Sequence, residues 1–384
     1  MINHVFISYS DGFPVYFIAA NTKIRFLGRG LISHGDRVLL LNKYYSKNNI
    51  AQLHGFEEGI EYVSFQKNGG KVKSSIVNTL KTFKFLKKEK RVCNLNVVYI
   101  GCGNFFLLAP IAIYARLLKY KVAFIYEEFQ AGLDLPLLYR INGFLHSYIL
   151  GYFVDFILPI SEFLVEKSQR FNKPIFKLPI CADFSNITHE EGKRSEEKYF
   201  LYCASAIYKK AFEFVIDAYL SAFGKNSSVK LHMVLSGRSD YIEEDKDYIN
   251  QKGLTDAIIV RTQLPYEILM SEYANAAGLL IPLFRNNIMD VARFSQKISE
   301  YLSTSRPVLS TDVGEITYYF KNKENMYIAS QDDSICFGEI MKYVIDHPDE
   351  AEIVGKNGFE FGKKNFDYRA ITDSLSRFLY ILED

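Results

Sequence analysis

The residues from Ser295 to Glu300 combine the start of a predicted helix with a carboxylate. Such a combination could bind a ligand that carries both an anionic group and a pair of hydroxyls. Ser295 can cap a helix that begins at Gln296 and Lys297, and the free N–H groups at a helix start favour an anion such as phosphate. Glu300 falls in the early turns of this helix, where its carboxylate could accept two hydrogen bonds from a ribose diol. A surface acid without a ligand is the competing interpretation of Glu300.

Two further polar pairs follow predicted strands, at the edge where open parallel sheets bind ligands. Gly237-Arg238 follows the strand Leu231–Leu235, and a glycine there lets the backbone approach a ligand closely. Glu127-Glu128 follows the strand Val122–Tyr126, and two adjacent acids could position a sugar hydroxyl or a proton in acid–base chemistry. It is equally plausible that these two acids only interact favourably with the dipole at the N-terminus of a following helix.

Several other kinds of site find no support in the sequence. The chain has no Walker loop and no G-x-S-x-G elbow, and its seven histidines show no metal-ligand spacing, so we expect no metal site. The five cysteines are dispersed without a C-x-x-C pair, which argues for a reducing compartment rather than a disulfide scaffold. Gly28-Arg29-Gly30 begins like a dinucleotide fingerprint, but it lies inside a predicted helix and lacks the third glycine. Two packing glycines are therefore the favoured interpretation.

Charge is divided unevenly along the chain, although the net charge is only +2. Residues 1–185 carry 23 Lys and Arg against 13 Asp and Glu, whereas residues 186–384 carry 23 against 31. This split favours two domains with different partners. Lys67–Arg91 holds nine bases and one acid, Glu89. A solvated amphipathic helix explains this cluster, and so does contact with anionic lipid headgroups. No nucleic-acid-binding motif accompanies it.

Apolar runs and helical patterns alternate along the chain, which predicts parallel, doubly wound sheets. In the first half we expect strands at Val5–Tyr9, Val38–Leu41, Val97–Ile100, Val122–Tyr126 and Phe156–Pro159, and helices at Lys23–Ser33, Ser74–Lys90, Phe105–Lys119 and from Glu162 after the cap Ser161. In the second half we expect strands at Tyr199–Ala204, Leu231–Leu235, Ala257–Val260, Gly278–Pro282 and finally Pro307–Ser310, and helices at Ala211–Phe223, Tyr266–Ala274, Gln296–Ser303, Asp349–Lys364 and Asp367–Leu382.

Membrane and targeting segments are not expected. The N-terminus has no basic region followed by a long apolar run, so it does not read as a signal peptide. Val97–Ala115 has 19 residues without a charge, which imitates a membrane span. Gly101 and Gly103 interrupt it, so a buried strand, turn and helix explain it better. We therefore expect a cytoplasmic protein.

The order of these motifs resembles the family-4 retaining glycosyltransferases, which have the GT-B fold. The second half is similar to their donor-binding domain over Ala204–Tyr219, over Leu264–Leu283, and over Lys297–Glu315, which resembles the signature K-x-x-E-Y-L…P-V…G-E. In the first half, LPISEFLVEKSQRF and KLPICADFS resemble two segments that end the acceptor domain. The resemblance spans most of the chain.

The resemblance assigns roles residue by residue. It implies that Lys210 is the lysine at the donor diphosphate, or Lys209 if the register shifts by one residue. Glu300 matches the second acid of an E-x7-E pair that binds the nucleotide ribose. Ser295 to Lys297 match the helix start beneath the phosphates, and Gly237 matches the glycine after the second strand of the donor domain.

Three positions depart from the family pattern. The first acid of the pair falls at Ala292, with Asp290 nearby but out of register, and the phosphate arginine falls at Ser205. The paired glycines of the N-terminal loop are absent from DGFPVYFIAAN. Another base must therefore assist Lys210, and Arg293 on the polar loop is our choice.

The resemblance implies an α/β GT-B architecture of two Rossmann-like, doubly wound domains with an interdomain cleft. We expect an acceptor-binding domain at 1–185, a linker at 186–198, a nucleotide-sugar-binding domain at 199–364, and a C-terminal helix at 365–384 that crosses back to the first domain.

The expected activity is metal-independent sugar transfer with retention, from a UDP- or GDP-linked donor to a glycan or lipid-linked acceptor, in bacterial surface polysaccharide or glycoconjugate synthesis. No cofactor besides this donor substrate is expected, and the +10 half of the chain suggests a peripheral position on the inner face of the cell membrane. The departures keep two alternatives open: a non-catalytic GT-B partner subunit or sugar-nucleotide binder, and a nucleotide-sugar epimerase.

Overall fold

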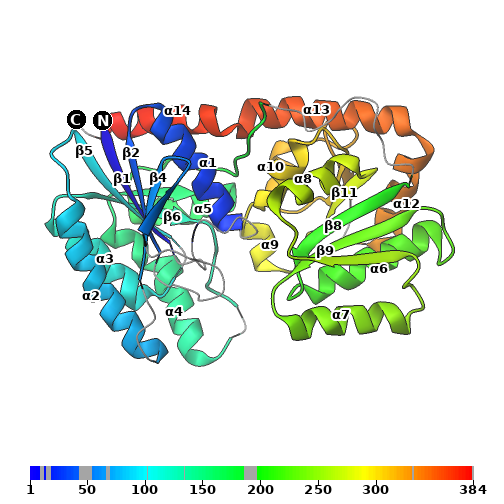
Figure 1. Cartoon of the computed structure of the whole chain (residues 1–384), viewed down its shortest axis with the longest axis horizontal. Helices are drawn as coiled ribbons and strands as arrows, with labels where there is room; N and C mark the ends of the chain where they lie inside the picture. The colour runs from blue at the N-terminus through cyan, green and yellow to red at the C-terminus, as the bar shows by residue number, and fades with distance from the viewer. Residues whose placement is uncertain are drawn as a thin grey trace. The chain divides into compact units, whose positions relative to one another are not determined.

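The chain forms two compact units, each built around its own sheet (Figure 1). The structure is a computed structural model that describes residues 1–8, 13, 19–42, 54–65, 70–101, 103–133, 135–185, 197–330 and 333–382. The first unit comprises Met1–Cys181, Ala292–Phe294 and Tyr368–Asp384, and the second comprises Ala182–Val291 and Ser295–Asp367. The predicted linker 186–198 lies outside the described residues, apart from Glu197 and Lys198.

The N-terminal unit contains a seven-stranded sheet in the order β3-β4-β2-β1-β5-β6-β7. Its strands are β1 (Ile2–Ser8), β2 (Arg37–Asn42), β3 (His54–Glu57), β4 (Ile60–Ser64), β5 (Leu95–Ile100), β6 (Lys121–Tyr126) and β7 (Phe156–Pro159). All pairings are parallel except that of β3 with β4. Every residue of β5 and β7 is buried, as expected of parallel strands that are covered on both faces.

The helices of this unit are α1 (Ala19–Ser33), α2 (Lys71–Glu89), α3 (Phe105–Leu117), α4 (Leu137–Tyr148), α5 (Glu162–Ser168) and α14 (Tyr368–Ile381). All of them overlap a predicted helix except α4, which was not predicted. Ser161 caps α5 as predicted, because its hydroxyl accepts a hydrogen bond from the N–H of Leu164. The α1 helix ends before Gly35, whose φ of +81° suits a glycine after a helix.

The C-terminal helix α14 groups with the N-terminal unit, where it packs against α1. The Phe26 and Tyr368 rings stack with their centroids 5.7 Å apart. His34 Nε2 lies 2.6 Å from Asp373 Oδ1. A Cβ on Gly30 would lie 2.2 Å from Thr372 Oγ1, so Gly30 is a packing glycine, as the sequence indicated.

The C-terminal unit contains a six-stranded parallel sheet in the order β10-β9-β8-β11-β12-β13. Its strands are β8 (Tyr199–Ser205), β9 (Lys230–Ser236), β10 (Ile258–Thr262), β11 (Gly278–Ile281), β12 (Val308–Thr311) and β13 (Tyr327–Ala329). Its helices are α6 (Lys209–Phe223), α7 (Ser239–Gln251), α8 (Tyr266–Asn275), α9 (Ile288–Ala292), α10 (Gln296–Leu302), α11 (Glu315–Tyr319), α12 (Ser334–Asp346) and α13 (Pro348–Phe366).

Some elements of the structure differ from the predictions or were not predicted. The strand predicted at Pro307–Ser310 is not the last one, because β13 follows it and pairs with β12. The hairpin of β3 and β4 was missed, since β3 is short and partly exposed. Within Val97–Ala115, Val97–Ile100 belongs to β5 and Phe105–Ala115 belongs to α3. No helix among the described ranges has the length and apolarity needed to cross a membrane.

Candidate functional site

The C-terminal sheet has a topological switch point between β8 and β11. From β8 the chain runs outward through β9 and β10, then returns to place β11 on the other side of β8. Loops that leave adjacent strands in opposite directions open a crevice at the carboxyl end of the sheet, which is where such sheets bind ligands. The loop after β8 leads into α6, and the loop after β11 is the polar segment from Pro282 to Asn287.

Lys210, in the first turn of α6, connects the two loops. Its Nζ donates a hydrogen bond to Asn286 Oδ1 at 3.0 Å and lies 3.9 Å from the centroid of the Phe284 ring. Both of these partners are uncharged groups. The N-terminus of a helix of 15 residues adds partial positive charge at the same place. The edge of the switch point therefore carries a lysine together with the N-terminus of α6.

Lys209 points to a different part of the unit. Its Nζ lies 2.6 Å from Asp245 Oδ1 and 3.2 Å from Glu244 Oε2, both on α7. Burial lowers the pKa of Lys209, but its hydrogen bonds to Asp245 and Glu244 outweigh burial and raise the pKa. Lys209 thus ties α6 to α7, and only Lys210 of the two lysines reaches the loop after β11.

Gly237 lies at the carboxyl end of β9, beside the end of β8. Its φ is +113°, and a Cβ there would lie 3.2 Å from Ser205 Oγ. Arg238 pairs with Asp240, with Nε 3.0 Å from Oδ1, and its guanidinium lies over the Tyr241 ring at 4.8 Å. Gly237 therefore belongs to the crevice edge, whereas Arg238 is held by Asp240 at the start of α7.

The loop after β11 is held in place by buried polar side chains. Asp290 Oδ2 accepts hydrogen bonds from the N–H of Phe284 and from Asn287 Nδ2, both at 3.1 Å. Thr311 Oγ1 accepts a hydrogen bond from the N–H of Leu283 at 2.9 Å. Asp290 thus fixes the position of the loop that carries Asn286, a role the sequence did not reveal.

Glu300, on α10, is almost completely buried, with 6% of its surface exposed. Burial raises its pKa to about 7, although the charge of Lys297 acts to lower it. Among the described residues, we find no hydrogen bond or ion pair to the Glu300 carboxylate. The neighbouring Tyr301 hydroxyl accepts a hydrogen bond from the N–H of Cys203 at 3.2 Å, which fixes α10 against β8.

The start of α10 differs in one respect from the expectation. Ser295 occupies the N-cap position, as predicted, but its side chain makes no capping hydrogen bond. Gln296 Nε2 donates to Ser299 Oγ at 3.1 Å instead of facing solvent. The backbone N–H groups of this short helix, together with Lys297, remain the features that match the predicted phosphate-binding helix start.

Arg293 does not group with the other predicted donor-binding residues. It belongs to the segment Ala292–Phe294, which groups with the N-terminal unit, whereas Lys210 belongs to the C-terminal unit. Ala292 is fully buried, and its carbonyl accepts a hydrogen bond from the Ser161 hydroxyl. A carboxylate at this position would have to be accommodated in a closed environment.

In the N-terminal unit, Glu127 and Glu128 follow β6 as predicted. The next helix, α4, begins only at Leu137, so the interpretation as a helix-dipole pair was wrong. Glu127 Oε1 lies 2.8 Å from Nζ of Lys23, a buried lysine of α1. Glu127 therefore balances a buried cation, and this pairing leaves it poorly suited to act as a free base.

Sequence analysis did not identify His146 as a residue of this edge of the N-terminal unit. His146 Nε2, on α4, lies 3.3 Å from the Gly101 carbonyl oxygen at the end of β5. Burial lowers the pKa of His146 to about 4, so its imidazole is neutral at pH 7. Its ring packs edge-on against Phe124, which indicates a structural role.

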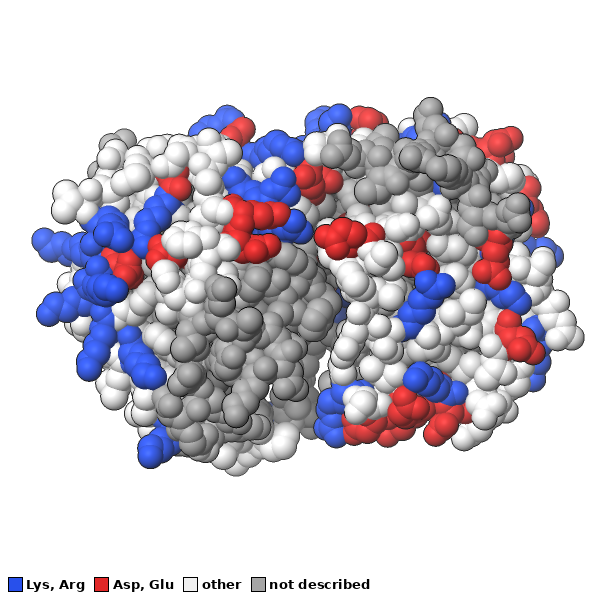
Figure 2. All heavy atoms as spheres, viewed as in Figure 1, with Lys and Arg blue, Asp and Glu red and all other residues white. Residues whose placement is uncertain are grey.

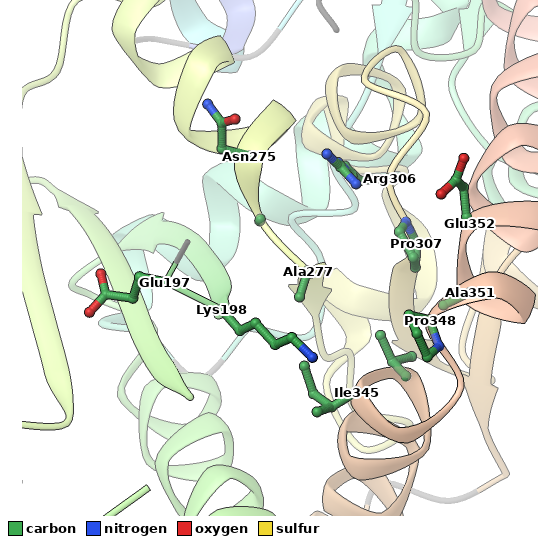
Figure 3. Close-up of a pocket in the computed structure, with 12 residues that line it drawn as sticks. Glu197, Lys198, Asn275, Ala277, Arg306, Pro307, Ile345, Pro348, Ala351 and Glu352 are labelled. Atoms are coloured by element: carbon green, nitrogen blue, oxygen red, sulfur yellow. The ribbon is translucent and has the colours of Figure 1, made fainter. Parts of the chain in front are cut away.

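A cavity of the C-terminal unit lies away from these residues, at the amino-terminal ends of β8, β11 and β12, and has a volume of about 80 Å³ (Figure 3). In Figure 3 the Lys198 side chain extends toward Ile345, while Arg306 and Glu352 lie on either side of Pro307. It contains none of the predicted site residues. No cluster of three or more His, Cys, Asp or Glu suited to a metal ion occurs within the described part of the chain.

The comparisons with known proteins agree with this geometry. The family model described as "Glycosyl transferases group 1" matches residues 183–361. No curated protein matches the sequence. Among solved structures, the chain is similar to sucrose-phosphate synthase from Thermosynechococcus elongatus, with a TM-score of 0.76, 15% identity, and 100% of this chain and 99% of that chain covered.

Two further solved structures have comparable similarity. HepE from Anabaena, in complex with UDP-glucose, has a TM-score of 0.75 at 13% identity and covers 98% of this chain and 99% of its own. A glycosyltransferase from Rickettsia africae has a TM-score of 0.70 at 13% identity and covers 100% and 99%. These similarities establish the two-domain GT-B fold that the sequence motifs indicated.

Proposed function

We propose that this chain, which carries a group 1 glycosyl transferase domain over residues 183–361, transfers a sugar from a UDP- or GDP-linked donor to a glycan or lipid-linked acceptor. The observation that carries the proposal is the position of Lys210 at the switch point, where its ammonium group bridges the loops after β8 and β11. The HepE structure with UDP-glucose supports this class of donor.

The chemistry requires stabilisation of a leaving diphosphate. As the sugar–phosphate bond breaks, the electron pair of that bond remains on the phosphate oxygen, and negative charge grows there. The Lys210 ammonium and the N-terminus of α6 would stabilise this charge, at about 3–4 kcal/mol for one well-placed donor. The loop that carries Asn286 is already fixed by Asp290, so little reorganisation would oppose this effect.

Glu300 would bind the donor through its ribose. A carboxylate can accept a hydrogen bond from each of the two ribose hydroxyls, and a buried carboxylate gains more from such bonds than an exposed one. The pKa of about 7 means that the carboxylate forms readily once hydroxyl donors are present to stabilise it.

We further propose transfer with retention and without a metal ion. In this mechanism the departing phosphate oxygen takes the proton of the acceptor hydroxyl on the same face of the sugar, so no protein base is needed. The pairing of Glu127 with Lys23 favours this route over a mechanism that uses Glu127 as the base. The biological setting that fits this activity best is synthesis of a bacterial surface polysaccharide or glycoconjugate in the cytoplasm.

A non-catalytic nucleotide-sugar-binding subunit is the second candidate. The specific observation in its favour is that buried Ala292 replaces the first acid of the family pair. Incubation of the protein with a panel of UDP- and GDP-sugars tests both candidates. Hydrolysis or transfer that depends on Lys210 supports the enzyme, binding without turnover supports the subunit, and conversion to another nucleotide sugar indicates an epimerase.

A further inference from the structure

The outward side of α2 combines lysines with exposed apolar residues. Lys73, Ile76, Leu80, Lys84 and Lys87 are all exposed, and their spacing of three to four residues places them on one side of the helix. Glu89, the single acid of α2, is buried and paired with Arg37 at 3.0 Å. The exposed side of α2 is therefore basic and apolar, with no acidic side chain.

Helix α3 packs beside α2 and exposes an apolar row. Phe106, Pro110, Ile113 and Leu117 recur at helical spacing, and each is exposed. Leu117 has 75% of its surface exposed. A helix that turns one apolar row to the sheet and a second one outward lacks the polar face expected in water.

Helix α4 packs beside α3 and continues the apolar surface. Exposed apolar residues concentrate on α4 and the segment before it: Leu135, Leu137, Leu138, Tyr139, Ile141 and Phe144. Leu138 has 78% of its surface exposed. Together α2, α3 and α4 form a continuous layer, and exposed apolar surface on this scale marks an interaction site.

The charge around this layer is mainly basic. Figure 2 shows Lys and Arg gathered at the end of the N-terminal unit where α2 lies, and Asp and Glu gathered over α7 of the other unit. Neither α3 nor α4 contains an acid. Beyond the ends of α2 and α3, an open groove of about 690 Å³ is lined by five bases and one acid: Lys90, Arg91, Arg116, Lys119, Lys121 and Asp155. Asp155 already accepts hydrogen bonds from Arg116 and from the N–H of Val122.

We propose that the outward layer of α2, α3 and α4 docks on an anionic lipid bilayer. The apolar rows of α3 and α4 enter the boundary between headgroups and acyl chains, while the lysines of α2 and the bases of the groove bind lipid phosphates. Charge complementarity favours an anionic bilayer as the partner. The exposed lysines match its negatively charged headgroups, and the exposed apolar rows match its acyl chains. Docking goes beyond the proposed sugar transfer and does not depend on it.

Vesicle flotation of the full chain tests the charge component. Wild type binds vesicles that contain about a third of phosphatidylglycerol, does not bind pure phosphatidylcholine vesicles, and is released at about 0.5 M salt, where screening shortens to a few ångströms. The double variant Lys84→Glu with Lys87→Glu binds about tenfold or more weakly. The matched control, Lys342→Glu with Lys364→Glu, makes the same charge change on exposed positions of the C-terminal unit and binds like wild type.

The apolar component has its own pair of variants. Leu138→Gln weakens binding several-fold, whereas Ile353→Gln, an exposed apolar position of α13 with 58% of its surface accessible, does not. Equal binding by both charge variants, or equal binding to neutral and anionic vesicles, overturns the proposal. So does a stable dimer that Leu138→Gln dissociates, because the layer would then be a protein interface.

A lipid-free assay separates this inference from the proposed function. Hydrolysis of the nucleotide sugar in solution is unchanged in the α2 and α4 variants, because these helices carry no proposed donor-binding residue. Loss of vesicle binding with intact hydrolysis assigns docking to this layer. Vesicle binding by a protein without any transferase activity supports docking and refutes the proposed function alone.

Discussion

Lys210, in the first turn of α6, and Asn286, in the loop after β11, lie on the two sides of the β8–β11 switch point, and Lys210 Nζ donates a hydrogen bond to Asn286 Oδ1 at 3.0 Å. The amide oxygen of Asn286 fixes the ammonium group without cancelling its charge. This arrangement resembles preorganisation for an anion, because the cation is oriented before any ligand arrives. The neighbouring Lys209 points elsewhere and forms an ion pair with Asp245 of α7.

The first prediction follows from this pair. Lys210→Ala should lower kcat by about a hundredfold or more, because charge on the leaving diphosphate grows in the transition state. Asn286→Ala should lower kcat by about tenfold or less, since it removes only the group that positions the lysine. Steady-state kinetics with the preferred nucleotide sugar checks both. Full activity in Lys210→Ala would show that Lys210 does not stabilise the leaving diphosphate.

The second prediction concerns Lys209. Lys209→Met should reduce the free energy of unfolding by about 1–3 kcal/mol, because it leaves the buried Asp245 carboxylate without its partner. The double variant Lys209→Met with Asp245→Asn should recover part of this stability, because the charge is removed as well. Chemical denaturation of the three proteins measures the effect, and kcat of the folded single variant should stay within a few-fold of wild type.

The sequence could predict the sheets because their strands are buried on both faces. The predicted strand Phe156–Pro159 coincides with β7, and the Ser161 cap was confirmed, since both depend on local patterns. The hairpin of β3 and β4 turns at Glu58 and Gly59, which both have positive φ as in a two-residue type I′ loop, but Glu-Gly is not the Asn-Gly or Asp-Gly pair that predicts such a turn. The residues on either side of this turn are polar and alternate only weakly in hydropathy, so they do not predict a pair of strands.

Less of the candidate site could be predicted from the sequence. Lys209 and Lys210 are adjacent and chemically identical, and only their partners on α7 and on the loop after β11 distinguish them. Asn286 and Asp290 are ordinary polar residues in a polar loop, and their roles depend on contacts with Lys210 and Phe284. Such contacts arise from tertiary structure, so no spacing rule identifies them.

The third prediction concerns the packing of α1 against α14. Gly30→Ala should reduce the free energy of unfolding by about 1–3 kcal/mol, because the new Cβ would overlap Thr372. Gly70→Ala is the control, since a Cβ at Gly70 meets nothing within 4 Å and its φ is −65°. Thermal denaturation should show a small change for the control. A Gly30→Ala protein as stable as wild type would contradict the packing described here.

The fourth prediction is a pH dependence of stability that arises from Glu300. Its pKa of about 7 in the folded protein lies above the ordinary value of 4.5, so the folded state holds the proton more tightly than the unfolded chain. This group therefore stabilises the fold fully below pH 4.5, and the contribution is lost as pH rises through 7. Glu300→Gln should exceed wild type in stability at pH 8, by up to roughly 3 kcal/mol, and the gain should disappear by pH 5.

The last prediction joins Glu300 to the donor. If its carboxylate binds the ribose hydroxyls, donor binding favours the ionised form, so affinity should fall by about tenfold as pH decreases from 8 to 6. Glu300→Gln should bind more weakly at pH 8, through KM rather than kcat, and its affinity should no longer vary over this range. Calorimetry with an intact nucleotide sugar is the right measurement, because its diphosphate has no terminal proton that titrates here. The same pH dependence in wild type and Glu300→Gln would exclude Glu300 from the ribose site, and the proposed donor site would then rest on Lys210 alone.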